Sequence, residues 1–447
     1  MRRFLYRNFR AVAGLQHRLG RRLTPAGQLV AAGLAATALI GPNTRMTVAY
    51  QAFTFLAALL LVAVAGSLRR PPRLTLRRQL PRYATVGEPL TYAVRARNGG
   101  ARAVSGLALI EDFADPRPSF EEFVSTPEPD EARRNRFDRA VGYPRWSWLL
   151  SMNRRATIDE HPLPLVPPGG EVEARLTLVP QRRGRVTLTG TTVARRESLG
   201  LARALRPLPA PAALLILPRR YPVPPITLRG ARRYQRGGIA LAQSVGDSEE
   251  FVSLRDYRPG DPLKRIHWRS WARIGRPVVR EYQDEFFVRH ALVLDTFAAA
   301  PTPAFEEAVS VAASFACTMG TQDSLLDLLF VGPEAHSVMA GRGVGHVDRM
   351  LEILAAVRPC RDRPFDTLAR LVLERQASLS GAICVLLGWD EPRRQLVEHL
   401  RALDVPTLVL IVTEPARPGA ATPGDAAEEA GVHRLEVGRV AEGLAAL

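Results

Sequence analysis

The sequence predicts a multidomain protein in three parts: a transmembrane helical hairpin, a β-sandwich, and an α/β domain with a mostly parallel sheet. Three observations lead to this fold class. Residues 25–68 are apolar apart from one short interruption, residues 73–218 alternate apolar and polar side chains, and residues 286–447 alternate apolar strands with helical segments. Each pattern has the periodicity of the element that it predicts.

Composition excludes some classes of protein before any motif is considered. The 447 residues carry 61 basic and 44 acidic side chains, a formal net charge of +17, and every basic residue is arginine except Lys264. A phosphate-binding P-loop needs a lysine after a glycine-rich stretch. Lys264 follows no such stretch, so a P-loop nucleotidase is excluded. The three cysteines are widely spaced and fit neither a zinc site nor a disulfide framework.

Residues 25–68 follow a basic segment, residues 1–24, and are predicted to cross the membrane twice. The run from 46 to 68 is long enough, because about 20 apolar residues span a bilayer core. The run from 25 to 40 is shorter, and its close partner and the tight turn favour a helical hairpin.

Arginines on both sides of the hairpin predict its orientation. Seven precede it and five follow it, whereas the turn holds only Arg45. The positive-inside rule then places both termini and the soluble domains in the cytoplasm, with the hairpin in the cytoplasmic membrane. Two alternatives are a cleaved signal peptide, since Ala63-Val64-Ala65 resembles a cleavage site, and a hairpin buried in a soluble core.

Residues 73–218 are predicted to form a β-sandwich of the immunoglobulin-like type. Several short alternating strands separated by glycine and proline favour that fold, which mostly serves as a spacer or interaction module. The predicted strands lie near residues 74–76, 90–97, 107–110, 171–179 and 185–190. The polar stretch 111–162 is predicted to be a long insertion, whose Trp146 and Trp148 either pack on the sandwich or lie near the membrane interface.

Residues 219–285 contain a block of motifs that resembles a known family. Between 246 and 281 the chain reads, in order, Glu250-Phe251, Leu254-Arg255-Asp256-Tyr257-Arg258-Pro259-Gly260-Asp261, Arg265-Ile266-His267-Trp268, Ala272-Arg273 and Arg280-Glu281. This order resembles the signature of the bacterial domain-of-unknown-function 58 family, in which a membrane hairpin and a sandwich precede the block and an α/β domain follows it. We expect the binding residues of the block to be Glu250, Phe251, Arg255, Tyr257, Pro259, Gly260, Asp261, Arg265, His267, Trp268, Arg273 and Arg280.

The residues of the block can also be interpreted physically. Arg258-Pro259-Gly260-Asp261 predicts a turn, because proline fixes φ at the second position and glycine accepts a positive φ at the third. Charges interleave around this turn, and Tyr257, Trp268 and Trp271 add apolar faces. Two interpretations stay open: a docking surface or anion pocket, and an ion-paired clasp that ties the sandwich to the next domain.

Residues 286–447 are predicted to form a parallel sheet covered by helices on both faces, because continuous apolar strands alternate with helical segments. We expect strands at 287–295, 325–331, 382–388 and 406–412, an edge strand at 433–437, and helices at 303–320, 346–357, 365–378 and 391–403.

The α/β domain resembles a von Willebrand factor A domain, in which the first strand ends at a metal-ion-dependent adhesion site of the form Asp-x-Ser-x-Ser. Here the strand ends Asp295-Thr296-Phe297-Ala298-Ala299, so both serines are lost. Asp295, Thr296 and Asp390 remain as a degenerate site. They are a poor oxygen set for Mg²⁺, so we expect no metal and no cofactor.

Taken together, these features predict a non-enzymatic, membrane-anchored scaffold that faces the cytoplasm and binds a partner. The family resemblance implies a MoxR-type AAA+ ATPase as that partner, in assembly or maturation of a protein complex or of the cell envelope. One alternative is a hydrolase at 246–281, where Ser248, His267 and Asp261 could be drawn as a triad without the usual glycine-flanked serine. The other is anionic-lipid or nucleic-acid binding through the basic residues of 219–280, although no specific nucleic-acid signature accompanies them.

Overall fold

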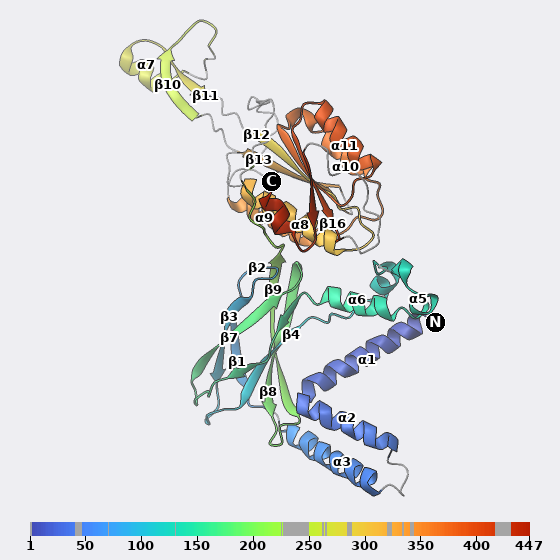
Figure 1. The fold of residues 1–447 in the computed structure, drawn as a ribbon. Helices are drawn as coiled ribbons and strands as arrows, with labels where there is room; N and C mark the ends of the chain where they lie inside the picture. The colour runs from blue at the N-terminus through green and yellow to red at the C-terminus, as the bar shows by residue number, and fades with distance from the viewer. Residues whose placement is uncertain are drawn as a thin grey trace. The chain divides into compact units, whose positions relative to one another are not determined.

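The computed structural model describes most of the chain, in two compact units (Figure 1). One is built mainly from Met1–Arg219 and the other mainly from Arg220–Leu447. The described residues are 2–40, 47–69, 71–129, 131–224, 226, 250–261, 263, 266–283, 288–319, 324–332, 335–339, 344–415 and 431–447.

Three helices begin the first unit: α1 (Arg2–Arg22), α2 (Pro25–Ile40) and α3 (Thr47–Ser67). Among the described residues, α3 is long and apolar enough to cross a membrane, and α2 is a shorter apolar helix. The two apolar helices lie against each other. Their contact, together with residues Leu23, Leu201 and Ala202, forms a small apolar cluster that includes Val30, Ala31, Leu59, Leu60 and Ala63.

Two sheets with a shared apolar core form the rest of the first unit, as predicted for a sandwich. One sheet has the order β1-β3-β7-β5 and the other β2-β9-β8-β4-β6. Neighbours are antiparallel, except that β2 and β9 are parallel. Their bounds are β1 Leu74–Gln79, β2 Tyr83–Thr85, β3 Leu90–Asn98, β4 Leu107–Phe113, β5 Ala156–Ile158, β6 His161–Leu163, β7 Glu171–Pro180, β8 Gly184–Arg196 and β9 Arg203–Leu217.

The alternating sequence pattern explains this core. Val94 and Ala96 of β3 and Leu176 and Leu178 of β7 are buried, while the residues between them are more exposed. Side chains of a strand point alternately to the two faces, so each sheet buries one row against the other sheet.

A buried ion pair interrupts the apolar core of the sandwich. Arg78 of β1 pairs with Glu111 of β4, and their side chains are 5% and 0% exposed. The guanidinium also donates to the hydroxyl of Thr191 at 2.7 Å and to the carbonyl of Ala210 at 2.8 Å. Burial, followed by the charge of Glu111, raises the pKa of the neighbouring Tyr92, which therefore stays a neutral phenol. The pair links the two sheets.

The predicted insertion contains the helices α4 (Phe120–Ser125), η1 (Glu131–Arg133), α5 (Arg136–Val141) and α6 (Tyr143–Asn153), and also β5 and β6. Helix α4 begins at a capping box, in which the Ser119 hydroxyl accepts from the backbone N–H of Glu122 at 3.0 Å. Trp146 packs on Tyr6 and Phe9 of α1, in an apolar cluster separate from the core of the sandwich.

The second unit begins with the strands β10 (Glu250–Asp256) and β11 (Val278–Gln283), which pair antiparallel with α7 (Trp268–Ile274) between them in sequence. A bridge between Ile266 and Val279 ties the connection before α7 to β11. The family motifs therefore belong to one β-strand pair and its connecting helix.

The remainder of the second unit is a six-stranded sheet with the order β14-β13-β12-β15-β16-β17. Its strands pair in parallel, as predicted, except for the antiparallel edge strand β14, which the sequence did not reveal. Their bounds are β12 Val288–Leu294, β13 Ser324–Val331, β14 Ala335–Met339, β15 Gly381–Leu386, β16 Thr407–Thr413 and β17 Val432–Glu436.

Helices cover both faces of this sheet, with α10 and α11 on one side and α8 on the other (Figure 1). Cys384 of β15 is fully buried among the apolar side chains of α10 and α11, as expected for a core residue. The helices are α8 Pro303–Met319, α9 Val344–Ala356, α10 Asp366–Leu373, η3 Gln376–Ser378, α11 Glu391–Ala402 and α12 Val440–Ala445.

Candidate functional site

The predicted turn of the family motif is present. The backbone N–H of Asp261 donates to the carbonyl of Arg258 at 3.0 Å. Gly260 has a φ of 106°, a backbone conformation that side chains other than glycine rarely adopt. The turn follows β10 directly, so the charged residues on its two sides are brought back toward each other.

Arg255 and Asp261 close this turn with a bidentate ion pair. The two guanidinium nitrogens lie 2.7 Å from the two carboxylate oxygens, and the backbone N–H of Arg258 donates to the same carboxylate at 2.8 Å. The hydrogen bonds from Arg255 and then from the Arg258 backbone lower the pKa of Asp261 to about 2. A carboxylate with so low a pKa is a weak general base.

The low pKa of Asp261 predicts how the turn responds to acid. Because the folded pKa lies below the ordinary value of 3.8, the stabilisation is fully present above that value and is lost as the pH falls through about 2. We expect the carboxyl ¹³C shift of Asp261, in selectively labelled protein and assigned with Asp261→Asn, to titrate near pH 2. Arg255→Met should return the midpoint toward 3.8. A midpoint near 3.8 in the unmodified protein would contradict the ion pair.

His267 and Ser270 form a second local contact. The Nδ1 atom of His267 lies 2.6 Å from the Ser270 hydroxyl, and the backbone N–H of His267 donates to the carbonyl of Val278 at 2.9 Å. Asp261 is engaged by Arg255 and Arg258. Ser248, the third residue of the hypothetical triad, lies outside the described residues. The described contacts of His267 therefore fix the start of α7.

Apolar side chains of the block remain exposed. Trp268 is 63% exposed and stacks on Trp271, with ring centroids 5.2 Å apart and planes 20° apart. Leu254, Leu263 and Ile274 are exposed too. Exposed large apolar side chains mark an interaction surface when they form a contiguous patch, and these four come from β10, the segment that follows it and α7. We call the exposed side chains of Leu254, Leu263, Trp268 and Ile274 the apolar set.

The other predicted binding residues take various positions. Tyr257 is half-buried and its backbone N–H donates to the carbonyl of Pro277 at 3.0 Å, while Pro259 and Arg273 are exposed. In the strand register Glu250 pairs with Gln283, Phe251 with Tyr282, and Leu254 with Arg280. Arg265 lies outside the described residues.

The ends of β12 and β15 hold the three residues of the degenerate adhesion site. Asp295 is fully buried, and its carboxylate accepts from the backbone N–H groups of Phe297 and Leu387 at 2.9 and 3.0 Å. The Thr296 hydroxyl donates to the carbonyl of Val331 at 2.6 Å, so it is directed to the backbone. Asp390 precedes α11 at the next strand end.

A guanidinium links the two carboxylates of this strand end. The Nε atom of Arg393 lies 2.7 Å from Asp295 Oδ2, and its Nη1 atom lies 2.5 Å from Asp390 Oδ2. The same guanidinium lies over the ring of Phe365, 4.8 Å from its centroid. The donor set therefore does not fit a metal ion, because an internal arginine supplies the positive charge. Sequence reasoning missed Arg393, whose spacing of three residues from Asp390 on a predicted helix was the available signal.

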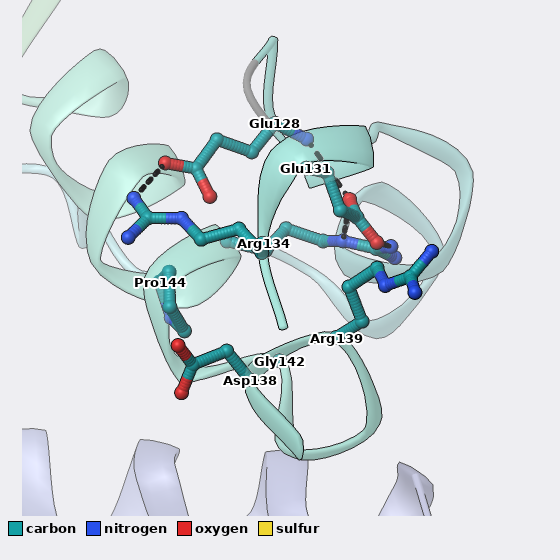
Figure 2. Close-up of a pocket in the computed structure, with 8 residues that line it drawn as sticks. Glu128, Glu131, Arg134, Asp138, Arg139, Gly142 and Pro144 are labelled. Atoms are coloured by element: carbon teal, nitrogen blue, oxygen red, sulfur yellow. Dashed lines mark hydrogen bonds and ion pairs between the residues drawn. The ribbon is translucent and has the colours of Figure 1, made fainter. Parts of the chain in front are cut away.

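Apart from the Asp295 strand end, the part of the chain that the structure describes shows no candidate metal site. It has no cluster of three His, Cys, Asp or Glu side chains positioned to hold a metal. Figure 2 shows a pocket among the insertion helices, where Arg134 pairs with Glu128 at 2.8 Å and Glu131 pairs with Arg145. The pocket is lined largely by charged side chains that pair with one another.

Comparison with known proteins agrees with the family resemblance. Residues 253–413 match the family model described as protein of unknown function DUF58. The match runs from β10 to β16, with the turn, α7 and the Asp295 strand end inside it.

Two further likenesses were found. The chain is 27% identical over 158 residues to the uncharacterized protein YeaD of Bacillus subtilis (strain 168), which covers 35% of this chain and 39% of that relative's length. A solution NMR structure of the CARDB domain of a Pyrococcus furiosus protein aligns with 33% of this chain and 96% of its own, at 12% identity. Its TM-score of 0.17 is too low to carry an argument.

Proposed function

We propose that this chain is a non-enzymatic docking protein, anchored in the cytoplasmic membrane, whose soluble domains face the cytoplasm and bind a MoxR-type AAA+ ATPase. The pair would work in assembly or maturation of a protein complex or of the cell envelope. The observation that carries the proposal is the exposed Trp268, stacked on Trp271 inside the family segment. The partner class comes from the family resemblance and not from the geometry.

Membrane anchoring by two helices is the first part of this proposal. Helix α3 has the length and composition of a membrane span, and α2, a 16-residue helix without charged side chains, lies against it. Arginines on both sides of the pair favour cytoplasmic termini. The sandwich, taken as immunoglobulin-like, and the α/β domain, taken as von Willebrand factor A-like, would then be adaptor domains.

Ion pairs within the motif block support docking through its apolar set. Arg255 pairs with Asp261, and Arg276 lies 3.3 Å from Asp256, so these acidic side chains are engaged within the block. The clasp interpretation and the docking interpretation are then compatible: ion pairs hold the turn, and the apolar set stays exposed. Tryptophan is enriched among the residues that contribute most to binding.

Removal of the exposed indole tests the docking surface. We expect Trp268→Ala to weaken binding of the ATPase roughly 30-fold, because an interface tryptophan contributes about 2 kcal/mol or more. The full-length protein, purified in mild detergent, would be titrated with the ATPase in ATP and in ADP. Phe137→Ala is the matched control, since Phe137 is 73% exposed and lies in α5.

Two results would count against the proposal. Failure of the ATPase to bind the unmodified protein in both nucleotides would exclude it as the partner. Equal binding by Trp268→Ala and Phe137→Ala would exclude the apolar set as the docking surface while leaving the partnership in place.

A hydrolase at the same block is the alternative function. The His267–Ser270 contact favours it, because a hydroxyl 2.6 Å from an imidazole nitrogen is within reach for general-base activation. Ser270→Ala separates the two functions. A hydrolase would lose turnover of cell-envelope precursors and keep its fold, whereas a docking protein would show no turnover before or after the change.

A further inference from the structure

Helix α1 has two different faces, and its inner face is fixed to the first unit. Tyr6 and Phe9 pack on Trp146, and the Tyr6 hydroxyl donates to the carbonyl of Pro118 at 3.0 Å. Arg10, near the middle of the helix, lies 3.3 Å from Asp115, and Arg21, in its last turn, lies 2.5 Å from Asp112. These contacts set which side of the helix faces away from the domain.

The outer face of α1 is both apolar and basic. Four large apolar side chains on it are 46–68% exposed, namely Phe4, Val12, Leu15 and Leu19. At 3.6 residues per turn these positions fall on one side of the helix. Exposed arginines accompany them at positions 7, 18 and 22, and the helix contains seven arginines and no acidic residue.

The junction with α2 is held tightly to the turn between β8 and β9. The backbone N–H of Thr24 donates to the carbonyl of Leu201 at 3.0 Å, and its hydroxyl accepts from Gly27 at 3.1 Å. A Cβ atom at Gly27 would lie 2.0 Å from the Leu201 carbonyl oxygen, so only glycine fits there. Figure 1 shows α1 and α2 diverging from this junction. The carboxyl end of α1 therefore lies directly before the first apolar helix, α2.

We propose that the outer face of α1 lies on the anionic lipid surface of the membrane, as an interfacial helix that continues into the anchor. An interfacial helix combines a basic polar face with large apolar side chains that enter the headgroup region. Clustered arginines beside a membrane helix are attracted to anionic lipids. A second copy of α1 is a poor occupant, since two helices with arginines and no acidic residue repel each other. This inference rests on the proposed membrane anchoring and not on the ATPase partnership.

Fluorescence quenching in bilayers tests the proposal with the full-length chain. Single cysteines at Leu15, at Leu19 and at the control position Val179 would carry an environment-sensitive dye, in a Cys317→Ser background that removes the half-buried thiol. Val179 is 40% exposed and lies at the end of the sandwich where β8 starts, away from the β8–β9 turn. A label at Leu61 of α3 reports insertion of the anchor. The vesicles contain phosphatidylglycerol and a lipid with a nitroxide near its headgroup.

We expect dyes at positions 15 and 19 to be quenched severalfold more than the dye at position 179, and this quenching to fall when phosphatidylcholine replaces phosphatidylglycerol. Quenching at 61 but not at 15 or 19 would overturn the α1 proposal alone. Absence of quenching at 61 would overturn the membrane anchoring and the α1 proposal together. A blue shift at 15 that rises with protein concentration in detergent, without lipid quenching, would assign the face to a second copy and also overturn the proposal.

Discussion

Replacement of Arg393 by alanine is expected to destabilise the α/β domain by about 3–5 kcal/mol, the usual cost of removing one partner of a buried ion pair. Asp295 is 0% exposed and would keep only two backbone N–H donors, from Phe297 and Leu387. Hydrogen exchange of the full-length protein in detergent resolves this domain from the rest. Peptides from β12 and β15 should lose protection roughly 100-fold or more, because each 1.4 kcal/mol is a factor of ten.

Arg394→Ala is the matched control, because Arg394 lies next to Arg393 on α11 but pairs with Glu391 at the surface. Exposed pairs contribute about 1 kcal/mol or less, so β12 should keep its protection. Arg393→Met combined with Asp295→Asn should recover part of the loss, since no buried charge is then unpaired. Equal effects of Arg393→Ala and Arg394→Ala would contradict the buried bridge.

The same bridge predicts the response to divalent ions. In the unmodified protein the guanidinium lies between Asp295 and Asp390, so added Mg²⁺ or Mn²⁺ has no free carboxylate pair to occupy at this strand end. We expect neither ion to raise the melting temperature. A saturable rise with Mg²⁺ that disappears in Asp295→Asn would show that the ion displaces the arginine.

Replacement of Glu111 by glutamine is expected to destabilise the sandwich by a similar amount, about 3–5 kcal/mol. The change keeps the shape of the side chain but removes the charge that Arg78 neutralises, at a site where both side chains are almost fully buried. The bonds from Arg78 to Thr191 and Ala210 would remain and would offset only part of the loss. Peptides from β3 and β7 are the ones whose hydrogen exchange should accelerate.

An exposed ion pair in the same sandwich supplies the control. Arg95 and Glu173 lie on paired strands 3.4 Å apart, with side chains 47% and 40% exposed. Glu173→Gln should therefore cost about 1 kcal/mol or less. Arg78→Met together with Glu111→Leu should recover most of the stability, because replacing a whole buried pair with apolar residues is often neutral. Equal changes in hydrogen exchange for Glu111→Gln and Glu173→Gln would show that burial of the Arg78–Glu111 pair does not stabilise the sandwich.

Much of the architecture could be predicted from local patterns. β15 and β16 are largely apolar runs, and β12 ends in one, because both faces of a parallel sheet are covered. The structure places all three strands within a residue or two of the predicted bounds. The turn at Arg258–Asp261 was predictable for the same kind of reason, since proline and glycine restrict the backbone locally.

Other elements could not be predicted, because their partners lie far away in sequence. Helix α1 appeared only as a basic segment, since its inner face has meaning only beside Trp146 of the insertion. The short helices of the insertion are similarly too brief to be stable alone. β14 is five residues long and pairs only at the sheet edge.

The sequence by itself determined the order of the parts, the apolar helices, the alternating and continuous strands, and the family model that residues 253–413 match. Only the tertiary structure decided which charged side chains pair with each other. Arg393 reaches an aspartate 98 residues away in sequence, and Arg78 reaches a glutamate 33 residues away. The physical reason is that hydrophobic periodicity is local, whereas a buried charge finds its partner only after the strands have been brought together by folding.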